Sequence, residues 1–379
     1  MDNEIVVKFL NCDSVAKELE NIGFDASYIH HAIDKNNSRT IKVLNLKPQE
    51  ATILKQSALS LGFDAAVHRG VLDCSIEKSD AILTGSLVHF SKLCDAIEKQ
   101  PFKMKMVARN IRSLLFDKLQ PMKIGTKVFD WSRPYLMGIL NVTPDSFSDG
   151  GVYLNLDDAI KHFGKLVEDG ADIIDIGAES TRPGHQIIDS KEEIVRLKPI
   201  LKAINELNSD VIVSVDTRNV ETAKMALDMG ANLINDVGFD GFNQNMIDFV
   251  NANNVPYVLM HNLRVREALI DNVYVDLKNQ LEQITAPVIV DMGIGFGKTV
   301  EQNFELIKRV GEFNGLGAPI LVGHSRKSFI SKTFNCSTEE LDNATVLLSA
   351  KMALSGVNIL RVHDVKRHKL ALDVISKLN

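Results

Sequence analysis

From residue 134 onward, short apolar segments alternate regularly with longer amphipathic segments, and this rhythm restricts the fold more than any other feature of the chain. The short segments are rich in Val, Ile and Leu at consecutive positions, as parallel strands covered by helices on both faces are. They span residues 135–140, 172–177, 211–216, 232–236, 256–260, 287–291, 319–323 and 358–362. The clearest helical patterns between them span residues 156–170, 190–207, 219–230 and 302–315.

Eight strands that alternate with helices predict an α/β fold, a (β/α)8 TIM barrel, which typically needs about 250 residues. An open sheet that binds a dinucleotide would carry a GxGxxG turn between a strand and a helix. The glycine-rich segment at residues 293–298 has a different spacing. A dinucleotide cofactor is therefore not expected.

The first part of the chain has a shorter, mixed pattern, and residues 1–120 are predicted to form a small α/β domain. Pro48 can open a helix there and Gly62 can close it. Residues 121–133 mix proline, glycine and charged residues and are expected to be a linker with room for one short hairpin strand, before a barrel domain at 134–379. The elements expected in the first domain are strands at 40–46, 64–74 and 80–86 and helices at 49–62 and 87–100.

Composition excludes several classes of function. The formal net charge is −6 and no basic stripe stands out, so nonspecific binding of nucleic acid is not expected. No apolar run approaches the roughly 20 residues that cross a bilayer, and the acidic N-terminus does not resemble a signal peptide. A cytoplasmic protein without membrane contact is predicted. The cysteines are scattered and are expected to be free thiols without metal: Cys12, Cys74, Cys94 and Cys336.

Each predicted barrel strand ends in, or is followed by, a polar side chain. One such residue is explained by a helix cap in most proteins, but in a barrel all eight C-terminal strand ends meet at one rim, where active sites are built. A shared site is therefore predicted there. The residues at or just after the strand ends are Asn141, Glu179, Asp216, Asn235 and Asp236, His261, Asp291, the segment 323–328, and Arg361 with His363.

Seven segments from residue 134 to the C-terminus resemble the dihydropteroate synthase family in order and in sequence. They are GILNVTPDSFSDGG (138–151), DIGAESTRPG (175–184), VSVDT (213–217), IND (234–236), DMGIGFGKT (291–299), VGHSRKSFI (322–330) and RVHDV (361–365). The resemblance implies a transferase of folate biosynthesis that joins 6-hydroxymethyl-7,8-dihydropterin pyrophosphate to p-aminobenzoate, releasing pyrophosphate. It also implies a homodimer and a sulfonamide target. Residues 1–120 lie outside the core enzyme of the family.

The resemblance assigns roles to individual residues. A pterin ring has an amide-like edge, which carboxylates and carboxamides in a dry pocket can read. The residues expected to bind the pterin are Thr181, Asp216, Asn235, Asp291 and Lys327. The pyrophosphate would be bound by Asn141, Arg361 and His363, and the cofactor Mg²⁺ would be held at Asn141. The residues expected to bind p-aminobenzoate are Phe147, Arg182, Pro183, Phe296 and Ser328. The residues expected to be catalytic are Asp216, Lys327, Arg361 and His363.

The expected mechanism is departure of pyrophosphate followed by attack of the aryl amine, which is neutral at pH 7 and needs no strong base. Three residues also have an alternative structural interpretation. Asp216 could cap a helix, His363 could pair with Asp364, and Arg326 could be structural. Ser328 falls near a helix N-terminus, which favours an anion such as the p-aminobenzoate carboxylate.

Two departures from the family pattern and one rival function remain. The loop after His261 lacks the usual Gln-Gly-x-Pro type segment, and Met292 stands where proline is usual. The rival is a pterin-binding methyltransferase that passes the methyl group of methyltetrahydrofolate to a corrinoid protein. Such an enzyme has no need of the STRPG, SRKS or RVHDV segments present here. Residues 1–120 could instead be a protein-binding module without catalysis.

Overall fold

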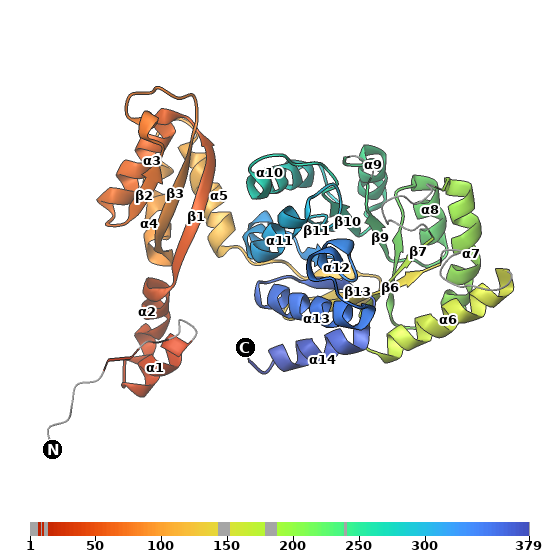
Figure 1. Ribbon diagram of the computed structural model, residues 1–379. Helices are drawn as coiled ribbons and strands as arrows, with labels where there is room; N and C mark the ends of the chain where they lie inside the picture. The colour runs from red at the N-terminus through yellow and green to blue at the C-terminus, as the bar shows by residue number, and fades with distance from the viewer. Residues whose placement is uncertain are drawn as a thin grey trace, which may run out of the picture. The chain divides into compact units, whose positions relative to one another are not determined.

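The computed structural model describes residues 7, 8, 10, 14–142, 152–178, 188–238 and 241–378, with the backbone alone at 152–155. The chain divides into two compact units, Met1–Lys118 and Leu119–Asn379 (Figure 1). In the described part of the chain, no helix is long and apolar enough to cross a membrane.

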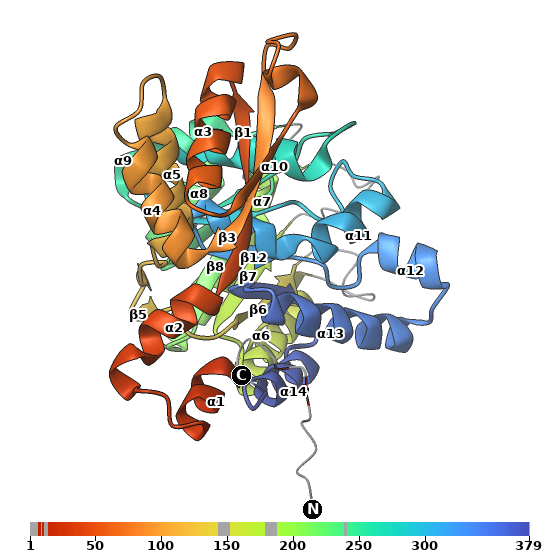
Figure 2. The same cartoon turned by 90° about the vertical axis from the view of Figure 1, so that its left-hand side faces the viewer.

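The first unit is built on a three-stranded antiparallel sheet with the strand order β1-β3-β2. Along β3, Ala81 and Leu83 are buried, whereas Ile82 between them is exposed, so one face of the sheet is covered. Helices α3 and α4 cover that face, and α5 packs against α4 (Figure 2). The elements are α1 (Val15–Asn21), η2 (Ala26–Tyr28), α2 (Ile29–Asn36), β1 (Ser38–Leu46), α3 (Pro48–Ser60), β2 (Asp64–Val67), η3 (Arg69–Val71), β3 (Ser79–Ser86), α4 (Leu87–Ile97) and α5 (Met104–Phe116).

This unit differs from the sequence prediction in two respects. The strand expected at 64–74 ends at Val67, because the chain turns into the short 3-10 helix η3. Helices α1, α2 and α5 were not predicted. Helix α5 has a clear apolar stripe, since its buried residues recur at the helical spacing i, i+3, i+4 and i+7: Met104, Val107, Ala108 and Ile111.

The second unit is a closed barrel of eight parallel strands in sequence order, which confirms the predicted (β/α)8 architecture. The strands are β6 (Tyr135–Asn141), β7 (Ile173–Gly177), β8 (Ile212–Asp216), β9 (Leu233–Asp236), β10 (Tyr257–Met260), β11 (Val288–Asp291), β12 (Ile320–Val322) and β13 (Ile359–Val362). The helices that surround them are α6 (Val152–Glu168), α7 (Ser190–Glu206), α8 (Val220–Asp228), α9 (Gln244–Asn253), α10 (Leu269–Leu281), α11 (Val300–Lys308), η5 (Val310–Leu316), α12 (Ser328–Phe334), α13 (Thr338–Leu354) and α14 (Val365–Ile375).

A hairpin precedes the first barrel strand and closes the N-terminal end of the barrel. It consists of β4 (Met122–Ile124) and β5 (Lys127–Phe129). The buried side chains of Ile124 and Phe129 pack on an apolar layer with one residue from each strand: Met137, Ile173, Ile212, Leu233, Val258, Ile289, Leu321 and Ile359. Much of the segment expected to be a linker is therefore packed on the barrel core. Its residues alternate between exposed and buried positions, and the buried apolar ones face the barrel.

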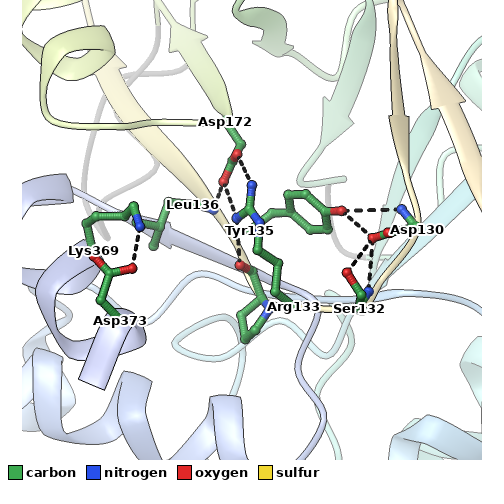
Figure 3. A network of polar contacts seen from close by, with 9 residues as sticks. Asp130, Ser132, Arg133, Tyr135, Leu136, Asp172, Lys369 and Asp373 are labelled. Atoms are coloured by element: carbon green, nitrogen blue, oxygen red, sulfur yellow. Dashed lines mark hydrogen bonds and ion pairs between the residues drawn. The ribbon is translucent and has the colours of Figure 1, made fainter. Parts of the chain in front are cut away.

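A polar network fixes the chain between this hairpin and β6 (Figure 3). The Arg133 guanidinium donates to both carboxylate oxygens of Asp172, at 2.6 and 3.1 Å, and the Leu136 backbone N–H donates to the same carboxylate at 2.9 Å. The Tyr135 hydroxyl donates to Asp130 at 2.8 Å, while its ring lies 4.2 Å from the Arg133 guanidinium carbon. These bonds tie the hairpin to the start of β6 and to the segment before β7.

The hairpin should contribute strongly to the stability of the barrel. Phe129→Ala is expected to lower the free energy of unfolding by about 3–5 kcal/mol, because it leaves a cavity under the apolar layer. Trp131, the only tryptophan of the chain, lies 5.8 Å from the Phe129 ring, so its fluorescence in a urea titration reports unfolding of this unit. Val128 lies in the same hairpin with 62% of its surface exposed, and Val128→Ala is the control, with an expected change within about 0.5 kcal/mol. Equal midpoints for the two variants would contradict the role of the hairpin.

Candidate active site

Along each barrel strand alternate side chains point inward, and their chemistry changes from one end of the strand to the other. On β13, Ile359 belongs to the apolar layer beside the hairpin, and Arg361 follows two residues later. On β8, Ile212 belongs to the same layer, and Asp216 ends the strand. The interior is therefore polar at the C-terminal ends of the strands, where the loops begin.

Arg361 and Asp175 form the centre of this polar end. The Arg361 Nε donates to Asp175 Oδ2 at 2.6 Å, and its Nη2 donates to Asp216 Oδ2 at 2.9 Å. Asp175 also accepts hydrogen bonds from the Ser214 hydroxyl at 2.6 Å and from the Asn235 Nδ2 at 2.9 Å. One carboxylate from β7 thus joins residues from β8, β9 and β13 across the barrel.

Asp175 was not predicted as a site residue. It is fully buried in the middle of an apolar strand. Its side chain lies on the inward face of that strand, the same face as Ile173 and Gly177. A buried ionised carboxylate is costly unless it is paired, so its position indicates a partner across the barrel. An Asp at an inward position of an apolar strand was the sequence signal by which Asp175 could have been found.

The carboxylate of Asp216 bonds to Arg361 in the site and does not cap helix α8. Helix α8 begins after Asn219, and the side chain of the buried Glu193 holds this turn by accepting from Thr217, Asn219 and Thr222 at 2.9, 2.9 and 2.6 Å. Burial raises the pKa of Asp216 well above its usual range, against the opposing effect of Arg361. The capping alternative is therefore wrong for Asp216.

Asp291 and Lys327 lie at the opposite side of the polar end. Asp291 accepts a hydrogen bond from the backbone N–H of Gly293 at 2.7 Å, and burial raises its pKa while the Lys327 charge lowers it. The Lys327 ammonium donates to the carbonyl of Ile294 and lies 4.2 Å from the centre of the Phe296 ring. Burial lowers the pKa of Lys327 to about 7.

His363 follows β13 and contacts Ser325. Its Nδ1 lies 2.9 Å from the Ser325 hydroxyl oxygen, and its backbone N–H donates to the same oxygen at 3.2 Å. The Asp364 carboxylate accepts from the backbone N–H of Arg367 and so caps α14. Ser325 was not predicted, although it belongs to the segment after the seventh strand.

Two inward positions of the polar end carry glycine. Gly177 pairs with Asn141 across β6 and β7, and a methyl group added to it would contact Asp216 at 3.4 Å. Gly323 follows β12, and a methyl group there would lie 3.7 Å from Arg361. The absence of side chains at these positions leaves room between the charged groups.

A cavity of about 900 Å³ opens at this end of the barrel. Its described wall includes the cationic residues Arg264, Lys298, Arg326 and Lys332 but no Asp or Glu, so it suits an anionic ligand. Asp216, Asn235 and Asp291 lie outside this wall, and Asp216 is joined to it by Arg361. Six of the predicted site residues line it: Asn141, Phe296, Lys327, Ser328, Arg361 and His363.

Other predicted residues have structural positions or cannot be placed. Arg326 donates to both carboxylate oxygens of Asp342 at 2.7 and 2.8 Å, which supports the structural alternative. Ser328 is the first residue of α12. The predicted residues that lie outside the described part of the chain are Phe147, Thr181, Arg182 and Pro183.

Removing the Asp175 carboxylate should disrupt the polar end of the barrel. Asp175→Ala leaves Arg361 and Asn235 without their shared acceptor, so the free energy of unfolding is expected to fall by about 3–5 kcal/mol. Asp175→Asn keeps an acceptor oxygen and should cost less. The exposed Asp210→Ala is the control, and urea unfolding followed by Trp131 fluorescence is the measurement. A loss as small as that of the control would show that Asp175 does not organise the site.

Comparisons with known proteins agree with this geometry. The family model described as "Pterin binding enzyme" matches residues 137–363. A dihydropteroate synthase of Clostridium beijerinckii is 43% identical over 262 residues, covering 66% of this chain and 96% of the relative. A probable bifunctional folylpolyglutamate synthase/dihydropteroate synthase of Halobacterium salinarum is 37% identical over 361 residues, covering 90% of this chain. The chain spans only 43% of that longer relative.

Solved structures give the same result. The dihydropteroate synthase of Clostridium difficile, determined in the presence of pteroic acid, aligns with a TM-score of 0.63 and 37% identity. That of Xanthomonas albilineans with 4-aminobenzoic acid aligns with a TM-score of 0.63 and 33% identity. Each alignment covers 68% of this chain and 98% of the other. The chain therefore belongs to the dihydropteroate synthase family of pterin-binding enzymes.

Proposed function

We propose that the barrel of this chain condenses 6-hydroxymethyl-7,8-dihydropterin pyrophosphate with p-aminobenzoate to give 7,8-dihydropteroate and pyrophosphate. The observation that carries the proposal is the pairing of two features at one end of the barrel. A layer of buried carboxylates and a carboxamide lies beside a cavity whose described wall has cations and no carboxylate. The relatives support it, since one named structure was determined in the presence of pteroic acid and the other with 4-aminobenzoic acid.

The pterin would be read by the buried polar layer. Asp216 and Asp291 supply acceptors for the ring N–H and amino groups, and Asn235 can both donate and accept. Lys327 would donate to the ring oxygen, since its charge and that of Asp291 attract each other. Thr181, the fifth expected contact, lies outside the described residues.

Through Arg361, binding of the diphosphate group would be coupled to binding of the pterin ring of the same substrate. In the structure its Nη2 is bound to Asp216 while its Nε is held by Asp175. An arriving diphosphate would take over Nη2, and Asp216 would then be released to bind the pterin. The ion pair with Asp175 would keep the guanidinium in the site throughout, beside Asn141 and His363.

The residues fit a metal that arrives with the diphosphate. Among the described residues, no three His, Cys, Asp or Glu side chains gather into a metal-binding group. Asn141 offers a carboxamide oxygen, and Mg²⁺ often binds through substrate phosphates with only one or two protein oxygens. Arg361 and His363 line the same cavity and disfavour a bare cation there. Bound Mg²⁺ would neutralise charge that develops on the leaving pyrophosphate.

The aryl amine would enter from the Phe296 and Ser328 side of the cavity. Phe296 offers an apolar face to the benzene ring, and Ser328 offers a hydroxyl to the carboxylate. Phe147, Arg182 and Pro183 are proposed to complete this pocket. After pyrophosphate departs, the neutral amine attacks the exocyclic carbon of the pterin, so no strong base is required.

We also propose that the chain forms a homodimer through α13 and α14, which pack side by side in both views (Figures 1 and 2). Large apolar side chains of these helices and the residues that follow face solvent, with exposures between 54% and 74%. Such a row on two adjacent helices is typical of a surface that a second protein covers. The residues are Leu347, Leu354, Leu370, Val374 and Leu378.

The catalytic proposal predicts coupled products. The full chain, supplied with the dihydropterin pyrophosphate and Mg²⁺, should release pyrophosphate in a p-aminobenzoate-dependent manner, with dihydropteroate formed in equal amount by chromatography. Chelation of Mg²⁺ should abolish turnover and leave binding of the unphosphorylated pterin alcohol unchanged. Tight pterin binding without a coupled product would contradict the proposal, and methyl transfer would then be assayed.

The dimer proposal predicts a change in mass. Leu370→Glu should convert the dimer to a monomer in sedimentation velocity, because it places a charge in the covered surface. Val195 on α7 is equally exposed, at 66% against 68%, and Val195→Glu is the matched control that should remain dimeric. A monomeric unmodified chain, or a dimeric Leu370→Glu variant, would refute this interface.

A further inference from the structure

The loop between β11 and α11 surrounds a buried ammonium group that the proposed chemistry does not use. The Lys298 Nζ donates to three backbone carbonyls, those of His261, Gly293 and Phe296, each at 3.1 Å. The three N–H bonds of an ammonium match three acceptors. Lys298 therefore joins the end of β10 to both ends of the segment from Gly293 to Phe296.

His261 defines the protonation states in this contact. Its Nε2 lies 3.2 Å from Asp276 Oδ2, and its Nδ1 lies 3.3 Å from Lys298 Nζ. Burial lowers the pKa of His261 to about 4, so the ring is neutral at pH 7. A ring with its proton on Nε2 donates to the carboxylate, and its Nδ1 then presents a lone pair to the Lys298 charge, whose three N–H bonds go to the carbonyls. Burial also lowers the pKa of Lys298 to about 8, which leaves it mainly protonated at pH 7.

The backbone of this loop has a shape that favours glycine. Gly293, Gly295 and Gly297 have φ angles of 68°, 84° and 60°, in the left-handed region. A methyl group on Gly293 would lie 2.0 Å from the His261 carbonyl oxygen. Glycine is also the residue with the greatest freedom in the unfolded chain, so the loop needs bonds that fix it. The Lys298 ammonium supplies three of them.

The same loop forms one side of the proposed p-aminobenzoate pocket. The Ile294 carbonyl accepts from the Lys327 ammonium, and the Phe296 ring lies against it. Both contacts come from the segment that Lys298 closes. Building on the proposed function, we infer that Lys298 is a positioning residue: it holds Phe296 in place for the second substrate by fixing the carbonyls of the loop.

The test is steady-state kinetics of the full chain with the substitution Lys298→Met. The Michaelis constant for p-aminobenzoate should rise about tenfold or more, while the dissociation constant for the pterin alcohol changes less than about twofold. Lys308→Met, on the exposed face of α11, is the matched control and should leave both constants unchanged. An unchanged Michaelis constant in Lys298→Met would overturn the inference.

A double-mutant cycle separates positioning from general stability. If Lys298 acts through Phe296, the effects of Lys298→Met and Phe296→Ala on that Michaelis constant should not multiply, and the double variant should resemble the worse single variant. Multiplicative effects would overturn the inference. Lys298→Gln retains two N–H donors and serves if the Met variant does not fold; its Michaelis constant should still rise. Absence of turnover in the unmodified chain would instead contradict the proposed function.

Discussion

The polar end of the barrel depends on one buried ion pair, that between Asp175 and Arg361. Charges in a protein interior lose their hydration, and only close partners with good geometry offset that loss. Here one guanidinium lies between two carboxylates, and the more central one accepts two further hydrogen bonds, from Ser214 and Asn235. The pair therefore fixes side chains from four strands without using any of the loops.

Two carboxylates and one guanidinium also leave an imbalance of charge. Burial opposes ionisation of Asp216, which is why its pKa is raised even beside Arg361. Burial thus disfavours the charged form of the group that would read the pterin. A ligand that offers N–H donors would restore the ionised form, so binding and proton release should be linked at this position.

Two further cations of the site donate to backbone carbonyls. Lys298 and Lys327 both bond to carbonyls of one loop, whereas Arg326 is paired with the Asp342 carboxylate. Carbonyl dipoles hold an ammonium group without cancelling its charge. The described cavity wall therefore remains positive, as the proposed binding of a diphosphate and a benzoate requires.

The sequence predicted the barrel well because each strand is a short apolar run with a polar residue at or just after its end. It predicted the inward residues at strand ends, such as Asp216 and Asp291, for the same reason. Asp175 was missed because it lies inside a strand, where the pattern was taken as a single apolar unit. Lys298 was missed because its partners are backbone carbonyls, which leave no residue pattern. Hairpin residue Phe129 was missed as core because its partners come from all eight strands.

The space between the charged groups exists because residues 177 and 323 are glycines and have no side chains. It does not depend on an unusual backbone conformation at these residues. A methyl group at either position would make ordinary contacts, between 3.4 and 4.0 Å, and neither residue is in the left-handed region. Alanine is therefore compatible with the folded barrel at both positions while it narrows the room for a ligand. Ligand preference can therefore change at these positions in single steps that leave the scaffold intact.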